Sequence, residues 1–177
     1  TPGPHRAVVM ITGSGPQSRD EPIMNHRPFL VWADALTRLG IAVLRYDDRG
    51  VGASTGNFNE ARTTDLARDV EAAVDYLRSR KEIDNQRIGL IGHSEGGMIA
   101  PMVAVSRPKD VSFIVLLAAP GLRGDSILLM QSEVISRLSH TPDSIREATV
   151  QLNRSLFAQL VPPTTDEEAL RQSLAEV

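Results

Sequence analysis

Cysteine is absent from this chain of 177 residues. Its absence excludes disulfide bonds, thiolate metal sites and a cysteine nucleophile. It is compatible with a reducing or an oxidising compartment, so the localisation stays open. The chain also lacks an apolar run long enough to span a membrane. With 41% hydrophobic and 23% charged residues, its composition is that of a soluble globular protein.

The chain has no large excess of charge of either sign. The formal net charge is −3, and the two signs are mixed along the sequence. There is no basic stripe that could neutralise the phosphates of a nucleic acid. We therefore expect no nucleic-acid partner.

Short apolar runs alternate with amphipathic segments in the first part of the chain. Buried parallel strands are expected at residues 6–12, 41–46, 87–92 and 111–118. Helices are expected at residues 28–39, from Thr64 or Asp65 past Leu77, and at 96–106. This alternation predicts an α/β fold whose mostly parallel sheet is covered by helices on both faces.

Past Gly121 the pattern changes, because only helices are predicted, at residues 126–138, 143–160 and 166–175. We therefore divide the chain into a core at residues 1–121 and a helical cap or lid segment at 122–177. The first cap helix carries an apolar stripe, which we interpret as core and which in a capped enzyme could also roof an acyl pocket. The stripe consists of Ile127, Leu128, Met130, Val134 and Leu138.

The most informative motif follows the third predicted strand. Residues 92–96 read Gly-His-Ser-Glu-Gly, which is the Gly-x-Ser-x-Gly pattern of a nucleophile elbow. At such a sharp strand-to-helix turn the serine takes a strained backbone conformation, and the flanking small residues let the strand and the helix pack closely. Ser94 is therefore the candidate nucleophile.

Two further motifs accompany the elbow. Residues 11–16 read Ile-Thr-Gly-Ser-Gly-Pro, and residues 46–52 read Tyr-Asp-Asp-Arg-Gly-Val-Gly. With Gly-His-Ser-Glu-Gly-Gly at 92–97, the chain resembles the N-terminal part of the α/β-hydrolase superfamily, in the capped esterase and serine-aminopeptidase-like branch of bacterial hydrolases. The resemblance implies a partial α/β-hydrolase fold followed by a helical cap segment.

The resemblance also implies a chemistry and a set of residues. It makes Ser94 the nucleophile, the N–H of Glu95 one oxyanion donor, and the Gly13–Ser14 region the source of a second donor. The implied substrate is a small carboxylic ester, thioester or peptide-like amide, attacked through an acyl-enzyme. No cofactor and no metal are implied.

Activation of Ser94 requires an acid and a histidine, which follow the serine in this fold. Only His140 does so; it could pair with Asp125 or Glu133, but it precedes Thr141-Pro142 at a helix end, where a cation simply suits the helix dipole. His93 is interpreted as structural, packed against a neighbouring strand or loop, because adjacent residues on an elbow point in different directions.

We therefore expect the triad to be incomplete in these residues. The chain opens on Thr1-Pro2-Gly3-Pro4 without a start methionine, which we interpret as a cut inside a longer protein. We expect it to stop within or just after the cap, so that the parent protein supplies the rest of the triad.

Two charged loops have alternative interpretations. Asp47, Asp48 and Arg49 could form a metal or acid–base cluster, but we expect the carboxylates to accept backbone N–H groups and to form a local ion pair. Arg19, Asp20 and Glu21 either line the mouth of the site or form a solvated charge run. His26 precedes the first helix and could touch substrate.

Two rival functions stay open. Gly13-Ser14-Gly15 after a strand resembles part of a nucleotide-binding loop, although Pro16 and Ser18 depart from the required glycine spacing. Alternatively, the chain is a non-catalytic half-domain. Because the edge beside residues 111–118 would be uncovered, it would then form a homo-oligomer or associate with a missing C-terminal half.

Overall fold

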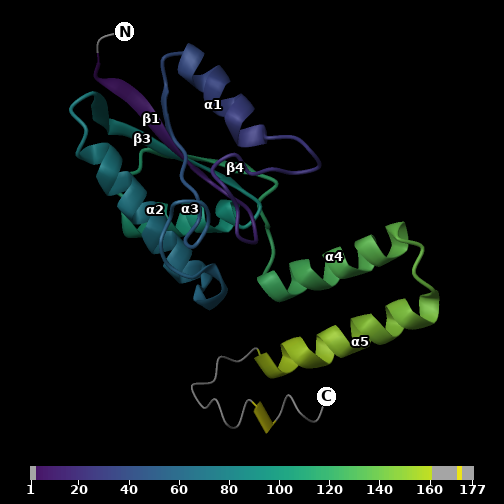
Figure 1. Cartoon of the computed structure of the whole chain (residues 1–177). Coiled ribbons are helices and arrows are strands. Elements are labelled where there is room, and N and C mark those ends of the chain that lie inside the picture. Colours follow the sequence, from purple (N-terminus) through teal and green to yellow (C-terminus); the bar gives the residue numbers. More distant parts are fainter. Residues whose placement is uncertain (1–2, 161–170, 173–177) are drawn as a thin grey trace. The chain divides into compact units, whose positions relative to one another are not determined.

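The computed structural model describes residues 3–160 together with residues 171 and 172. The chain divides into two compact units, Thr1–Pro120 and Gly121–Val177. The first unit contains the sheet, and the second contains helices (Figure 1). The interpretation of the second unit as a cap stays a prediction.

The first unit is a parallel α/β structure. Its elements are β1 (His5–Ile11), α1 (Pro28–Arg38), β2 (Ala42–Leu44), a 3-10 turn (Phe58–Glu60), α2 (Thr63–Arg78), β3 (Ile83–His93), α3 (Gly96–Ser106) and β4 (Phe113–Leu117). The strands lie in the order β2-β1-β3-β4, and every neighbouring pair is parallel. In register, Val9 of β1 faces Leu44 on one side and Leu90 on the other. The predicted fold class is confirmed.

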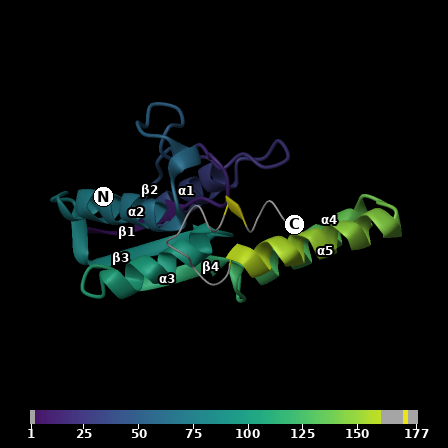
Figure 2. The same cartoon turned by 90° about the horizontal axis from the view of Figure 1, so that it is seen from below.

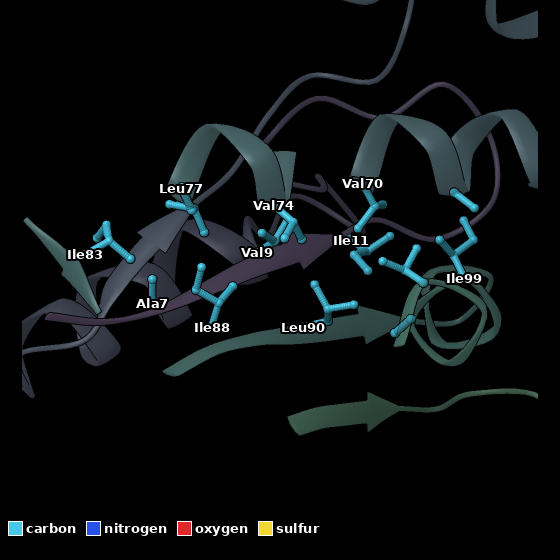
Figure 3. Packing of buried hydrophobic residues seen from close by; sticks show 13 residues of the cluster. Ala7, Val9, Ile11, Val70, Val74, Leu77, Ile83, Ile88, Leu90 and Ile99 are labelled. Carbon is cyan, nitrogen blue, oxygen red and sulfur yellow. The ribbon is translucent and has the colours of Figure 1, made fainter. Parts of the chain in front are cut away.

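Alternating residues of the two central strands supply both cores. Ala7, Val9 and Ile11 of β1 pack with apolar residues of β3, α2 and α3 in the larger cluster (Figure 3). Val8 and Met10 of β1 point to the other face, where they pack with Phe29 and Ala33 of α1. Figure 1 shows α1 on one side of β1 and β3 and shows α2 and α3 on the other, and Figure 2 gives a second view of the same elements. Helices therefore cover both faces of the central strands.

The fourth strand is less buried than the sequence predicts. Phe113 and Leu116 of β4 are each 45% exposed, although the run at 111–118 reads as a fully buried strand. The reason is its position, because β4 is an edge strand that pairs only with β3 among the described strands. An apolar run therefore identifies the strand correctly but not the extent to which its neighbours cover it.

Backbone pairing shifts two further boundaries. β3 begins at Ile83, four residues before the predicted start at Arg87, because Ile83 pairs with His5 across an irregularity in the β1–β3 register. β2 is shorter than predicted and ends at Leu44; Arg45, next in the chain, forms an ion pair with Asp20 in the loop after β1. The pattern of apolar side chains does not show where backbone hydrogen bonds between strands begin and end, so it misplaces these boundaries.

The second unit contains α4 (Gly124–Leu138) and α5 (Asp143–Leu160), which lie side by side. The prediction that the stripe on α4 is core is wrong: no residue of α4 or α5 is buried, and Leu128, Val134 and Leu138 are 53%, 55% and 76% exposed. Within the second unit, α4 and α5 pack only against each other among the described elements, so each helix is covered on one side. The predicted helix at 166–175 lies outside the described residues except for 171 and 172, which are helical.

Asp47 and Asp48, after β2, anchor the loop that follows β1. Asp48 accepts hydrogen bonds from the Thr12 hydroxyl at 2.9 Å and the Gln17 N–H at 2.9 Å. Asp47 accepts the Arg19 N–H at 2.8 Å and the Arg19 guanidinium at 2.6 Å. The expected role of these carboxylates as acceptors of backbone N–H groups is confirmed.

The prediction that Arg49 forms a local ion pair with the neighbouring carboxylates Asp47 and Asp48 is wrong. Arg49 turns away from its neighbours and binds Asp69 of α2, with Nη2–Oδ1 at 2.7 Å. The side chains of Asp47, Asp48 and Arg49 thus bind different partners. Together they connect the loop after β2 to the loop after β1 and to α2. Among the described residues, no group of three or more histidine or acidic side chains is placed to hold a metal ion.

The pKa values of the two anchoring carboxylates are shifted in opposite directions. The hydrogen bond from the Arg19 side chain is the main cause that lowers the pKa of Asp47 to about 2, and the Arg19 N–H adds to it. Burial raises the pKa of Asp48, against the opposing effect of its hydrogen bonds with Gln17 and Thr12. Asp47 therefore stabilises the anchored loop in its ionised form.

We predict that Asp47→Ala lowers the free energy of unfolding at pH 7 by about 1–3 kcal/mol, because it leaves the Arg19 donors without their acceptor. The folded-state pKa of Asp47 is depressed to about 2. Its contribution is therefore complete above the unfolded-state pKa of about 4 and is lost as the pH falls toward 2.

Urea denaturation of both proteins between pH 7 and pH 2 tests this prediction. Asp34→Ala is the control, because Asp34 forms only an exposed ion pair with Arg38 on α1 and its loss should change stability much less. If the difference in the free energy of unfolding between wild type and Asp47→Ala were as large at pH 2 as at pH 7, the ionised form of Asp47 would not be what stabilises the loop.

Candidate active site

Ser94 is the first of the two residues between a strand and a helix. β3 ends at His93 and α3 begins at Gly96, and Ser94 has a left-handed backbone with φ of 52°. Its N–H donates to the carbonyl of Leu117 on β4 at 2.9 Å, and its own carbonyl accepts the Gly97 N–H at 2.9 Å. A non-glycine residue in this conformation is strained, and these two bonds hold it in place.

The glycines of the motif make this turn possible. A Cβ on Gly92 would lie 2.1 Å from the carbonyl oxygen of Gly96. A Cβ on Gly96 would lie 2.3 Å from the carbonyl oxygen of Ile11, at the end of β1. Both distances are too short for real atoms, so the close packing that the motif predicts is confirmed.

The loop after β1 lies against the elbow. A Cβ on Gly13 would lie 3.2 Å from the Cβ of Ser94 and 3.3 Å from Nδ1 of His93. The Gly13 N–H is already taken, because it donates to Oε1 of Glu21 at 2.6 Å. By contrast, no hydrogen bond between described residues uses the N–H of Ser14 or of Glu95. Among the described residues, these two N–H groups are therefore unoccupied in the two segments that the sequence analysis names as sources of oxyanion donors.

Glu95 follows Ser94 as the N-cap residue of α3. Its carbonyl accepts the Ile99 N–H at 3.0 Å, and its carboxylate accepts the Thr63 hydroxyl at 2.9 Å. The side chain is therefore held at the start of α2, while the N–H lies at the positive end of α3, which favours negative charge.

Glu21 is the site residue that sequence analysis missed. The interpretation of residues 19–21 as a solvated charge run is wrong for Glu21, because its side chain is only 1% exposed. Its Oε1 lies 2.8 Å from Nδ1 of His93, and its Oε2 has no hydrogen-bond partner in the part of the chain that the structure describes. No residue pattern marks this position, since burial of one acid among three charged neighbours depends on how the loop folds back.

The histidines occupy different surroundings. His93 contacts the neighbouring loop through Glu21, as its structural interpretation predicts. His26 is exposed, and its backbone pairs with that of Ile23. His140 is exposed in the second unit, just past the end of α4, and its pairing with Ser94 stays a prediction. Among the described residues, the Ser94 hydroxyl has no hydrogen bond with a histidine.

One cavity adjoins the elbow. It has a volume of about 430 Å³ and is lined by Glu21, His93 and apolar side chains that include Phe29, Trp32 and Leu117. A larger cavity of about 590 Å³ lies between β2 and α2 and contains none of the predicted site residues. The smaller one is relevant to the chemistry because His93 directly precedes Ser94 and because Leu117 holds the Ser94 N–H.

The family model described as "Serine aminopeptidase, S33" matches residues 27–163. The chain belongs to this family, and it has the α/β-hydrolase fold. Esterase EstD of Thermotoga maritima is 29% identical over 91% of this chain and 38% of its own length. An uncharacterised 31.7 kDa protein of Escherichia coli is 36% identical over 78% of this chain and 48% of its own length.

Solved structures agree on the fold. The esterase Pf2001 of Pyrococcus furiosus has a TM-score of 0.58 at 19% identity, covering 84% of this chain and 55% of that one. Est1E of Butyrivibrio proteoclasticus, solved with bound ferulic acid, has a TM-score of 0.53 at 23% identity, covering 62% and 41%. The chain spans about half or less of the length of these relatives. Among the described residues, no helix combines the length and the apolar character needed to cross a bilayer.

We predict that Gly96→Ala destabilises the fold by about 3 kcal/mol or more, because the new Cβ would collide with the backbone of β1 rather than with a side chain that can move. Gly121→Ala is the matched control, since nothing lies within 4 Å of its Cβ position. Urea denaturation measures both. Equal stability of the two variants would show that α3 does not pack on β1 as closely as described.

Proposed function

We propose that this chain carries the nucleophile of a serine hydrolase that acts on carboxylic esters, thioesters or peptide-like amides. The observation that supports it best is the left-handed Ser94 at a strand-to-helix turn, flanked by the unused N–H groups of Ser14 and Glu95. Family membership and the likeness to EstD support hydrolysis as the reaction class. No cofactor and no metal take part in the proposed mechanism.

In the proposed mechanism, Oγ of Ser94 attacks the substrate carbonyl carbon while a base takes the hydroxyl proton. The carbonyl oxygen becomes an oxyanion, which the N–H groups of Ser14 and Glu95 stabilise. Collapse of this intermediate breaks the bond to the leaving group, which receives the proton, and leaves an acyl-enzyme. Water then attacks the acyl carbon while the base takes its proton. Collapse of the second oxyanion breaks the bond to Oγ, which regains a proton, and the carboxylic acid leaves.

The base and its acid are proposed to come from outside the first unit. His93 is a poor candidate, because adjacent residues on an elbow point in different directions and because, among the described residues, its ring is paired with Glu21 and not with the Ser94 hydroxyl. His140 has the right chain order, but we propose that the acid and the histidine belong to a longer parent protein and that the chain alone is incomplete. The helices α4 and α5 are proposed to belong to a cap over the substrate.

A nucleotide-binding function is not supported. A phosphate bound at the Gly13–Gly15 turn would need free backbone N–H groups. The Gly13 N–H instead faces the buried carboxylate of Glu21 at 2.6 Å.

We predict that a fluorophosphonate probe labels Ser94 in this chain only when imidazole is added to replace the missing base. An oxyanion hole without its triad still accelerates acyl transfer by about 10³–10⁴ over water, so a base from solution should restore labelling. Peptide mass spectrometry locates the adduct, and Ser94→Ala is the control. No adduct on Ser94 in folded protein with imidazole would contradict the proposed function.

The same assay identifies an internal base. Labelling without imidazole that disappears in His140→Ala would show that the chain completes its own triad. Labelling without imidazole that disappears in His93→Ala, and persists in His140→Ala, would instead make the elbow histidine the base. We expect His140→Ala not to change the imidazole-dependent rate appreciably.

Self-association is a second candidate function, favoured by the exposed apolar side chains of the edge strand β4. We propose that a second copy of the chain pairs with this edge. Sedimentation should show a dimer whose population rises with concentration. Leu116→Lys should weaken it at least about tenfold by placing a charge on the edge strand, whereas Leu39→Lys, beyond the end of α1, should not. A monomer at every concentration would contradict this candidate.

A further inference from the structure

Glu21 carries costs that its contribution to packing does not explain. Its carboxylate is 99% removed from solvent, its backbone is left-handed with φ of 48°, and its Oε2 has no hydrogen-bond partner among the described residues. Burying an acidic side chain with an unsatisfied oxygen is unfavourable, and strained, imperfectly satisfied positions concentrate at functional sites. Only Oε1, the other carboxylate oxygen of Glu21, has hydrogen-bond partners among the described residues.

Oε1 of Glu21 joins two separate segments of the site. It accepts the N–H of Gly13, on the loop after β1, at 2.6 Å. The same atom lies 2.8 Å from Nδ1 of His93, on the elbow. With a proton on Nδ1 of His93, both contacts are hydrogen bonds donated to the same oxygen. One atom therefore fixes the distance between the loop and the residue before the nucleophile.

This bridge determines which N–H can serve as the second donor. The Gly13 N–H is fixed on Glu21, which holds the peptide unit directly before the one that bears the Ser14 N–H. We propose that Glu21 is a positioning residue that acts through Gly13 and His93 to hold the Ser14 N–H in the oxyanion hole of Ser94. This inference rests on the proposed function.

The rest of the loop is anchored independently of Glu21. Asp48 holds Thr12 and Gln17, and Asp47 holds Arg19. Removal of the Glu21 carboxylate should therefore leave the loop attached and loosen only the peptide next to Ser94. This separation makes the proposal testable in folded protein.

The experiment compares wild type with Glu21→Leu, which keeps the volume but removes both bonds, and with Glu21→Gln, which keeps an acceptor oxygen. Asp20→Asn is the control, because the neighbouring acid pairs with Arg45 instead. Imidazole-dependent labelling of Ser94 is resolved into the maximal rate and the probe concentration at half-saturation. We expect Glu21→Leu to lower the maximal rate about 10²-fold, as loss of one oxyanion donor does, with little change in half-saturation. Glu21→Gln should recover most of that loss.

A second measurement does not depend on labelling. In ¹H–¹⁵N spectra of the whole chain, Glu21→Leu should shift the amide resonances of Gly13, Ser14 and Ser94 and speed hydrogen exchange at Gly13, whereas Asp20→Asn should not. If wild type is not labelled while these shifts occur, the proposed function fails and the positioning contact stands. Unchanged Gly13 and Ser14 amides in Glu21→Leu, or labelling at the wild-type rate, would overturn the role of Glu21.

Discussion

The close approach of three backbone segments governs this structure. The end of β1, the end of β3 and the start of α3 meet where Gly92 and Gly96 lack side chains, and a single Cβ at either position would overlap a carbonyl oxygen. Because α3 can begin directly above the sheet, Ser94 is forced into the two-residue turn between strand and helix. The strain at the nucleophile, the free N–H of Glu95 and the nearness of Gly13 all follow from this contact.

Around this contact, acidic side chains do the positioning, each in a different way. Asp47 is ionised and held by Arg19, Asp48 is buried on Thr12 and Gln17, and Glu21 is buried on Gly13 and His93. All of them bind the loop after β1 at separate points along its length. A loop with several glycines and a proline would otherwise have many conformations, and these contacts reduce them to one.

The sequence predicts most of the fold because its signals are local. The apolar runs and the Gly-x-Ser-x-Gly motif place the strands, the elbow and the helix at 96–106, and the helix at 143–160 has the predicted bounds. The failures concern tertiary surroundings. The apolar run of β4 says nothing about its edge position, the stripe on α4 needs a partner that the pattern does not name, and Glu21 becomes a site residue only because the loop folds back over it.

The strand order has a consequence for how the site responds to fluctuations. The loop containing Gly13 leaves β1 and the elbow leaves β3, and these are the two interior strands. Edge strands open more readily than central ones. Local unfolding that separates β2 from β1, or β4 from β3, therefore leaves the β1–β3 pair hydrogen-bonded. The segments around Gly13 and Ser94 therefore follow the two described strands that are least affected by opening at a sheet edge.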